Sequence, residues 1–309
     1  MPRSLAMEIL SAIVASRGHG PRPSGPLEDR EFEVEDFDRL EVLGPFDVEV
    51  ETGSPARVEA SGPQWALDNL LVEQDGKRLS ISCNGDVDDV RVLVSARSLT
   101  AVRASGSGDL SLDRVTGESF EYRGSGSGDA SLDELDVERL AVSGAGSGDI
   151  RIGKARAREF EAGMTGSGDL SIDTIESAGA KLTMNGSGDT SVDSYSGETF
   201  EVVITGSGDL ALDRLEADLV GFQLFGSGDV SIGGGQAREG RLETSGSGDI
   251  ACDGLELREA TICVRGSGDI DARVTGEAEV TIMGSGDVGL TGGATSKVSG
   301  SGSGELHRS

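Results

Sequence analysis

The chain has 309 residues, of which 48 are glycine and only 4% are aromatic, so we do not expect a globular core built around large rings. Its 55 acidic and 27 basic residues give a net charge of −28, which argues against nucleic-acid binding and against electrostatic docking on anionic lipid. No stretch reaches the roughly 20 apolar residues of a membrane-spanning helix, and the three cysteines fit neither a disulfide framework nor a metal site.

Residues 1–30 are expected to form a leader followed by a linker. Residues 5–16 are mostly apolar and follow Arg3, as in an export signal, but Glu8 interrupts them. Residues 17–30 are rich in Gly, Pro and charge, a composition typical of linkers. The leader favours an extracytoplasmic location, in the periplasm or at the cell surface. Because the signal is imperfect, its cleavage stays undecided at this point.

Residues 31–104 show the alternation of apolar and polar residues that is typical of strands. Apolar residues recur at every second position within residues 40–50, 79–81 and 90–94. The strongly repetitive motif of the later chain is absent from this region. We therefore expect irregular opening coils that cap the repeats, with a short helix or loop inserted at residues 63–67.

Residues 105–309 carry the tetrapeptide Gly-Ser-Gly-Asp ten times. Eight of the nine spacings between successive motif aspartates share one period of about 20 residues, and the ninth is slightly shorter. One further step of the shorter length reaches Glu305, which ends a Gly-Ser-Gly-Glu variant of the motif. Self-similarity at a fixed period of this length is the signature of a repeat architecture.

With each motif aspartate taken as position 0, the apolar residues of a coil fall at positions −9, −7, −5, +1 and +3. All are odd, which is the period of two of a strand with one buried face, and no period near 3.6 appears. We therefore expect two short strands per coil, at about −9 to −5 and +1 to +3, that stack in parallel on the next coil. The predicted fold is all-β, a single-stranded parallel β-helix (β-solenoid) with coils of about 20 residues.

The same parity places the motif glycines, at −3 and −1, inside a tight corner where no side chain would fit. Asp or Gly at position +4 predicts a turn at the far corner. Even positions then face solvent and form a carboxylate row at position 0 and a hydroxyl row at −2, with neighbours about 4.8 Å apart. The carboxylate row comprises Asp109, Asp129, Asp149, Asp169, Asp189, Asp209, Asp229, Asp249, Asp269 and Asp287. The hydroxyl row comprises Ser107, Ser127, Ser147, Ser167, Ser187, Ser207, Ser227, Ser247, Ser267 and Ser285.

Two carboxylates about 4.8 Å apart repel each other by about 1 kcal/mol in water, so something must offset the charge of the carboxylate row. One hypothesis is that Ca²⁺ bridges successive aspartates with help from Ser hydroxyls or backbone carbonyls. The alternative is that each aspartate accepts local backbone hydrogen bonds and stabilises its turn. No metal site is established by the sequence, and no other cofactor is indicated.

An enzyme is not predicted. Paired carboxylates are too abundant in this chain to mark an active site, and the two histidines, His19 and His307, lie in the tails. We find no Ser-His-Asp arrangement with a candidate base, no phosphate-cradling glycine loop and almost no aromatic side chains for sugar stacking. Phe225 and Arg265 interrupt the polar row at position −4 and are noted as candidate contact points.

A family resemblance rests on the opening region together with the repeats. Residues 37–42 (FDRLEV), 44–50 (GPFDVEV) and 75–81 (DGKRLSI), followed by the Ser-Gly-Ser-Gly-Asp repeats, resemble the family of putative auto-transporter adhesins with a head GIN domain. The resemblance covers about residues 32–305 and implies a bacterial, exported or envelope-associated β-helical protein. The chain departs from that pattern at its N-terminus, where a clean signal or a lipoprotein cysteine would be expected.

The function predicted from these observations is non-enzymatic binding or adhesion by an extended acidic, Ser-rich solenoid surface. The expected partner is a glycan, a matrix component or a cell-envelope component, and end-to-end or dimeric association of the chain is a further hypothesis. One alternative is a structural scaffold without a specific ligand. The other is a polysaccharide-active β-helix enzyme, which would need singular residues that the regular coils lack.

Overall fold

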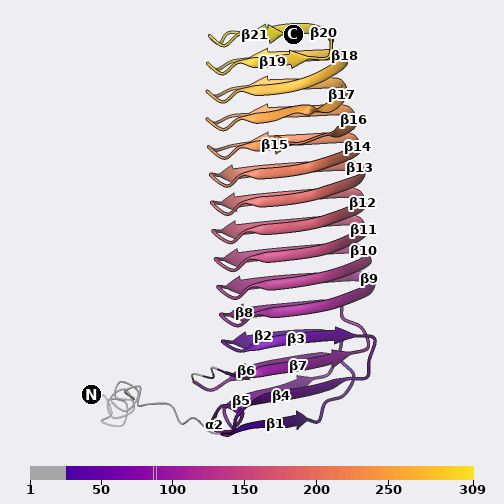
Figure 1. Ribbon diagram of the computed structural model, residues 1–309, viewed down its shortest axis with the longest axis vertical. Helices are drawn as coiled ribbons and strands as arrows, with labels where there is room; N and C mark the ends of the chain where they lie inside the picture. The colour runs from indigo at the N-terminus through magenta and orange to yellow at the C-terminus, as the bar shows by residue number, and fades with distance from the viewer. Residues whose placement is uncertain (1–25, 86, 88) are drawn as a thin grey trace, which may run out of the picture.

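The computed structural model describes residues 26–85, 87 and 89–309, and it is a tall stack of coils that rises from an irregular base (Figure 1). The full-length coils pair in parallel with a constant offset, so that Ala130 pairs with Ile150 and Gly146 with Gly166. The predicted single-stranded parallel β-solenoid is thereby confirmed. Its strands are β8 (Ala101–Gly106), β9 (Leu110–Gly126), β10 (Ala130–Gly146), β11 (Ile150–Gly166), β12 (Leu170–Gly186), β13 (Thr190–Gly206), β14 (Leu210–Leu224), β15 (Val230–Ile232), β16 (Gly235–Thr244), β17 (Ile250–Val264), β18 (Ile270–Ile282), β19 (Val288–Thr291), β20 (Thr295–Gly300) and β21 (Leu306–Arg308).

The prediction of two short strands per coil is wrong. Each of β9 to β13 is one continuous strand of 17 residues that runs from position +1 to position −3 of the next motif. The strand bends where the parallel pairing skips a residue, at Asp133 and Glu138 in β10. The aspartates at position +4 therefore mark a bend within a strand. A full interruption occurs between β15 and β16, where Gly233 and Gly234 occupy the positions of this bend.

Those bends also explain why some side chains at even-numbered positions are buried, although the sequence predicted buried residues at odd positions only. At each bend two successive residues face outward, as Asp133 and Glu134 do in β10, so the inward positions change from odd to even and later change back. Two extra inward columns result, at positions +6 and +8. The column at +6 comprises Val115, Leu135, Ala155, Ile175, Tyr195, Leu215 and Leu255, and the column at +8 includes Val137, Ala157, Ala237 and Leu257. The core is thus lined from three segments of each coil, and the predicted columns at −9, −7, −5, +1 and +3 line the other two.

Aromatic side chains fill the widest part of this core. Phe120, Phe160 and Phe200 are buried at position −9. The ring of Phe200 lies 4.7 Å from that of Tyr195 and 6.4 Å from that of Phe222, measured between centroids. The Tyr195 hydroxyl donates to the backbone carbonyl of Thr199 at 2.7 Å, so its burial leaves no unpaired polar group.

The motif glycines are required by the neighbouring coil. A Cβ at Gly168, at position −1, would overlap the carbonyl oxygen of Gly148 in the coil before it, and Gly166, at −3, meets that of Gly146 in the same way. Gly166 also has φ of +126°, which L-residues rarely adopt. The expectation that both glycines face the interior is correct for −1, where the residues are buried or half-buried. At −3 it fails for Gly106, Gly126, Gly146 and Gly166, which are exposed, whereas the other motif glycines at this position are half-buried.

The opening region is assembled in a different spatial order from its sequence. Its elements are β1 (Leu27–Phe32), β2 (Arg39–Gly44), β3 (Asp47–Thr52), β4 (Arg57–Pro63), the short helix α2 (Gln64–Leu67), β5 (Leu70–Asp75), β6 (Arg78–Cys83) and β7 (Arg91–Ala96). The coil formed by β2 and β3 lies between the coil of β6 and β7 on one side and β8 and β9 on the other. Antiparallel β5 and β4 then cover β6 and β7, and β1 covers β4.

Two sequence expectations meet the structure at this base. The short helix occurs where residues 63–67 predicted a helix or loop. The linker predicted to extend to residue 30 is shorter than expected, because Leu27–Phe32 form β1 and pair along their whole length with β4. The proposed leader and the start of the linker, residues 1–25, lie outside the described residues.

Candidate functional site

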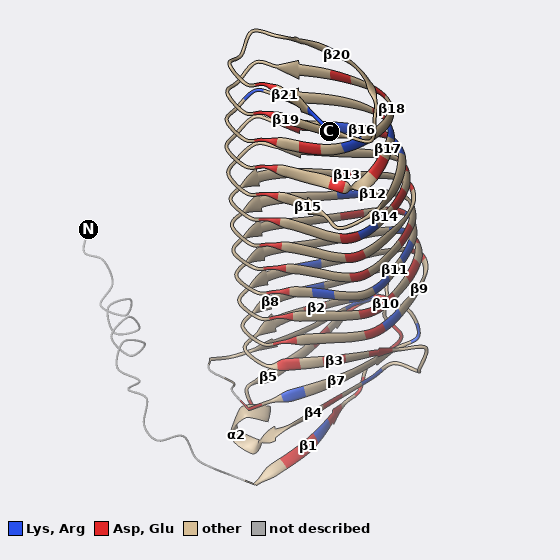
Figure 2. Ribbon diagram, turned by 45° about the horizontal axis from the view of Figure 1, so that its top comes forward, with Lys and Arg blue, Asp and Glu red and all other residues tan. Residues whose placement is uncertain are grey.

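The motif aspartates form a continuous hydrogen-bonded ladder along one edge of the stack. Oδ1 of each ladder aspartate accepts the backbone N–H of the next ladder residue at 2.7–2.9 Å, from Asp109 through to Glu305. Asp47 begins the ladder, because its Oδ1 accepts the N–H of Asp109 at 3.1 Å. Figure 2 shows the resulting acidic positions recurring at one edge in successive coils.

These bonds supply a charge-assisted partner for every ladder carboxylate. They run between coils, whereas the sequence predicted hydrogen bonds within the local turn. Asp47 was missed as a member, although Val48 and Val50 follow it at the +1 and +3 positions that follow every motif aspartate. Among residues 26–85, 87 and 89–309, no group of three or more His, Cys, Asp or Glu side chains converges as a metal ion would require. The bonds between coils therefore give the ladder carboxylates structural partners, and calcium bridging stays a hypothesis.

The ten serines at position −2 are all exposed, as the parity predicted. Within the described chain, only the Ser285 hydroxyl is hydrogen-bonded, accepting from Ser303 at 3.3 Å. The remaining nine hydroxyls of this row are available to a ligand or to water.

The carboxylate row borders a groove that follows the axis of the stack. The groove has a volume of about 900 Å³ and is lined by seven aspartates, from Asp47 to Asp209, one from each successive coil. Its floor is formed by position +1, including Leu110, Ile150 and Leu170. Its opposite wall is the row at position +2, which comprises Glu49, Ser111, Ser131, Arg151, Ser171, Ser191 and Ala211. The hydroxyls that face the ladder across this groove are thus those at +2, and the predicted serines at −2 do not line it.

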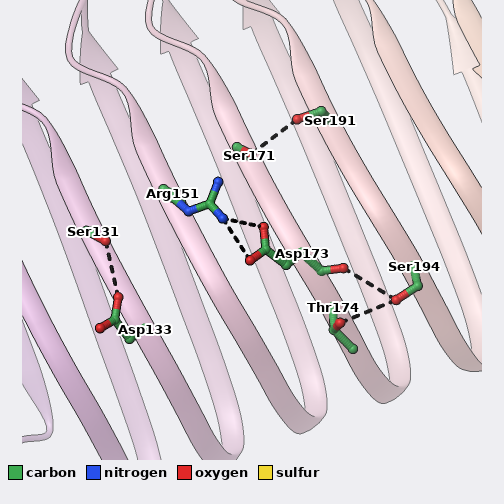
Figure 3. A network of polar contacts seen from close by, with 8 residues as sticks. All are labelled: Ser131, Asp133, Arg151, Ser171, Asp173, Thr174, Ser191 and Ser194. Atoms are coloured by element: carbon green, nitrogen blue, oxygen red, sulfur yellow. Dashed lines mark hydrogen bonds and ion pairs between the residues drawn. The ribbon is translucent and has the colours of Figure 1, made fainter.

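Polar side chains at position +2 form hydrogen bonds both between coils and within a coil (Figure 3). The guanidinium of Arg151 donates through one nitrogen to both carboxylate oxygens of Asp173, at 2.9 Å each, in the following coil. The Ser191 hydroxyl donates to that of Ser171 at 3.3 Å, and the Ser131 hydroxyl donates to Asp133 at 3.2 Å. Polar groups therefore line most of this side of the groove, and their hydrogen-bond partners differ from coil to coil.

Groups suited to catalysis are not gathered at this groove. His307, the histidine within the described residues, lies at the C-terminal end, with Nε2 3.5 Å from Oδ2 of Asp287. No Ser or Cys of the described chain hydrogen-bonds to His307. Burial raises the pKa of the Cys252 thiol to about 12, so that this group stays protonated at neutral pH and is a poor nucleophile.

The candidate contact points at position −4 have different surroundings. Phe225 is exposed, whereas the guanidinium of Arg265 forms an ion pair with Glu243. Met283 is a third large exposed side chain in this row, at 45% exposure, but Arg265 separates it from Phe225. The row offers isolated apolar side chains, and no continuous apolar patch forms there among the described residues.

Within the part of the chain that the structure describes, no helix has the length and apolar character needed to cross a membrane. A comparison with curated proteins finds no match. Among solved structures, a putative adhesin from Parabacteroides distasonis is 19% identical with a TM-score of 0.42, covering 93% of this chain and 98% of that chain. A putative adhesin from Parabacteroides merdae is 17% identical with a TM-score of 0.35, covering 93% of this chain and 97% of that one.

The family model described as putative auto-transporter adhesin, head GIN domain, matches two overlapping segments, residues 36–196 and 191–294. The match therefore includes the irregular base and most of the regular coils. The chain belongs to this family.

Proposed function

We propose that this protein is a non-enzymatic, extracytoplasmic adhesin that holds an extended glycan chain in the groove beside the carboxylate ladder. Membership of a family described as adhesins supports a binding role outside the cytoplasm. The observation that carries the proposal is the groove itself, in which an aspartate recurs in seven successive coils and faces Ser111, Ser131, Ser171 or Ser191 in four of them.

The chemistry of the groove suits a hydroxylated polymer. Each ladder aspartate uses Oδ1 for the bond between coils, so its second oxygen remains free to accept a hydrogen bond from a sugar hydroxyl or amine. Serine hydroxyls on the opposite wall can both donate and accept. Six steps of about 4.8 Å give a binding length of about 29 Å, which fits a chain lying along the axis and leaves a globular ligand poorly matched.

Adhesion fits this surface better than catalysis does. A carboxylate pair for glycoside cleavage would have to differ from its neighbours in environment, because one group must be protonated and the other ionised. The groove aspartates instead occupy equivalent positions with equivalent hydrogen bonds. Repetition of equal, shallow contacts is the arrangement expected of a surface that binds along its length.

The test is binding of neutral and amino-bearing polysaccharides by the wild-type protein and by a variant with a filled groove. Ser171→Trp places a large side chain in the wall, whereas Thr116→Trp places the same side chain on an exposed position of β9 outside the groove. We expect Ser171→Trp to abolish binding, Thr116→Trp to leave it intact, and both melting temperatures to stay within about 2 °C of wild type. Equal binding by all three proteins would refute the groove as the site.

A structural scaffold without a specific ligand is the second candidate. It is favoured by the ladder, because every motif aspartate already has a structural partner in the next coil and needs no ligand to account for it. Complete absence of glycan, matrix and envelope binding by the wild-type protein would favour this function over adhesion.

A further inference from the structure

Four arginines from distant parts of the sequence form a stripe at the junction between the irregular base and the regular coils. Arg78 of β6 pairs in register with Arg39 of β2, and Arg103 of β8 pairs with Arg123 of β9. Because β6, β2, β8 and β9 stack in that order, four successive coils each contribute one arginine. The stripe is stepped, because Arg39 pairs with Ala101 and Arg103 lies two residues farther along β8. Along the axis of the stack it spans about 14 Å, which is three steps of about 4.8 Å.

All four arginines are exposed, and two of them make no ion pair or hydrogen bond with described residues. These two are Arg78 and Arg103. Arg103 lies in register with Glu41 but forms no ion pair with it. Arg123 donates to Glu121 at 2.9 Å, and Arg39 lies 3.7 Å from Asp38. On a chain of net charge −28, a row of adjacent guanidinium groups that is only partly neutralised requires an explanation.

A hollow without a lining carboxylate lies beside the last two arginines. It has a volume of about 450 Å³, and it begins at Arg103 and Arg123 and extends across three further coils, the last of which contributes Asn185. Its sides carry the hydroxyls of Ser105, Ser125 and Ser143, and the Ser105 and Ser125 hydroxyls hydrogen-bond to each other at 2.7 Å. Gly163 leaves open space where its neighbours in the row carry side chains.

A second, smaller hollow continues the stripe toward the base. Its volume is about 200 Å³, and Arg39, Arg78 and Arg103 line it together with Glu41 and Glu121. Arg103 therefore lines both hollows and can reach a ligand in either. Along the coil, the larger hollow lies at positions −6 to −4, on the opposite side of the Gly-Ser-Gly-Asp corner from the glycan groove.

We propose that the arginine stripe and the larger hollow bind an anionic saccharide, with its carboxylate or sulfate groups on Arg103 and Arg123 and its hydroxyls against the serines. Arginine pairs bidentately with planar oxyanions, and that bond is stronger than a neutral hydrogen bond. No carboxylate is among the residues that line the larger hollow, but Glu121 is paired with the Arg123 guanidinium, so an anion there would share that group with Glu121. This site is separate from the proposed groove and has the opposite charge preference.

The experiment measures binding of three oligosaccharides of equal length at low ionic strength by calorimetry: oligogalacturonate, a heparin fragment and a neutral maltooligosaccharide. Arg103→Gln and Arg123→Gln remove one charge each from the stripe. Arg214→Gln is the matched control, because Arg214 is also exposed, makes no ion pair with described residues and lies outside both hollows. The full chain is used throughout, and melting temperatures verify folding.

We expect at least one of the two anionic oligosaccharides to bind and the neutral one not to bind at this site. Arg103→Gln should weaken binding about tenfold, the double variant should remove it, and Arg214→Gln should change it less than about twofold. The affinity of Arg103→Lys should lie between those of wild type and Arg103→Gln, because lysine keeps the positive charge but cannot form the bidentate pair of a guanidinium group.

Three results would overturn the proposal. The first is no binding of either anionic oligosaccharide, and the second is equal weakening by Arg214→Gln, which would indicate a general charge effect. The third is binding to vesicles of anionic lipid without binding to either saccharide. Ser171→Trp should leave anionic binding unchanged, so failure of the glycan groove and failure of this site give different results.

Discussion

The regular coils and the irregular base solve the same problem, the pairing of one strand layer with the next, by different means. In the regular coils each layer repeats the chemistry of the layer before it, with glycines against glycine carbonyls and a carboxylate on the next N–H. In the base, each layer is instead held by contacts that are not repeated from layer to layer. Strand β4 pairs antiparallel with β7, and Arg30 hydrogen-bonds to Leu67 and Asp68 at α2.

The two regions therefore differ in which residues can be substituted without loss of stability. A repeated contact restricts every residue in its column, because the same atoms meet the neighbouring coil at each level. A single contact restricts one residue and leaves the rest of its strand freer to vary. The two regions can be followed separately, because the only tryptophan, Trp65, lies in α2 of the base, whereas most strand signal in circular dichroism comes from the coils.

The largest expected effect comes from a motif glycine in the middle of the stack. Gly188→Ala places a Cβ against the carbonyl oxygen of Gly168, and both backbones are held by pairing on each side, so we expect a loss of about 3 kcal/mol in unfolding free energy. Gly179→Ala in the same coil has open space and should change stability by less than about 1 kcal/mol. Urea denaturation measures both. Equal stability of the two variants would contradict the stacking role of the motif glycines.

The second-largest effect should be a loss of stability at alkaline pH that begins in the regular coils. Burial raises the pKa of Tyr122 in β9 to about 12, whereas the same phenol titrates near 10 in the unfolded chain. A raised pKa means that ionisation favours the unfolded state, so stability is retained below pH 10 and falls as the pH rises toward 12. Two pKa units correspond to about 2.7 kcal/mol.

Tyr122→Phe should remove that part of the alkaline loss when circular dichroism follows thermal melting between pH 9 and 12. Both tyrosines lie in the regular coils, so the loss should begin there and reach Trp65 fluorescence later. An unchanged alkaline profile in Tyr122→Phe would show that this phenol does not contribute.

The carboxylate ladder should give a moderate effect. Asp169→Ala removes the acceptor of the Asp189 N–H, a bond of 2.8 Å at an exposed edge, and should cost about 1 kcal/mol. Asp169→Asn keeps an oxygen acceptor and lowers the charge of the row, so its unfolding free energy should stay within about 0.5 kcal/mol of wild type. Urea denaturation of both variants tests the hydrogen-bonding role.

The same proteins test the calcium hypothesis. Because Oδ1 of each ladder aspartate is already bonded to an N–H group and only Oδ2 is left for a cation, addition of calcium to chelator-treated wild-type protein should not shift its melting temperature. A large rise in melting temperature that is absent in Asp169→Asn would instead make the ladder a cation site.

The smallest effect should come from the base. Arg30 donates to the carbonyl of Leu67 and to Asp68, at 2.7 Å each, and thereby joins β1 to α2. Arg30→Gln should cost about 0.5–1 kcal/mol, because the pair is exposed. The change should appear in Trp65 fluorescence and leave the circular dichroism of the coils unaltered. A matched change at Arg57 of β4, which pairs with Glu31 of β1, removes a contact between two strands of the base and should cost a similar amount.

The sequence was sufficient for the coil period, the parallel stacking and the outward serines and aspartates, because identical positions recur at a fixed spacing. The buried column at +6 could not be predicted. Two successive outward residues, such as Asp133 and Glu134, shift the buried positions from odd to even, and no distinctive residue type marks this shift. The groove could have been predicted, because the same parity places the frequent serines at position +2 on the outside, next to the aspartates at position 0. The arginine stripe was not, because Arg39, Arg78 and Arg103 become neighbours only through the inserted order of β2, β6 and β8.

That inserted order has a consequence for how the chain folds. A regular coil closes a short loop, such as the one from Ala130 to Ile150, and can add to its neighbour as soon as it is made. Arg39, by contrast, must wait for Arg78 and Ala101, which lie much farther along the chain. Closing the longer loops costs more conformational entropy and slows the search for partners. We therefore expect the regular coils to nucleate and propagate first, and the base, although synthesised earliest, to lock into place in a later kinetic phase.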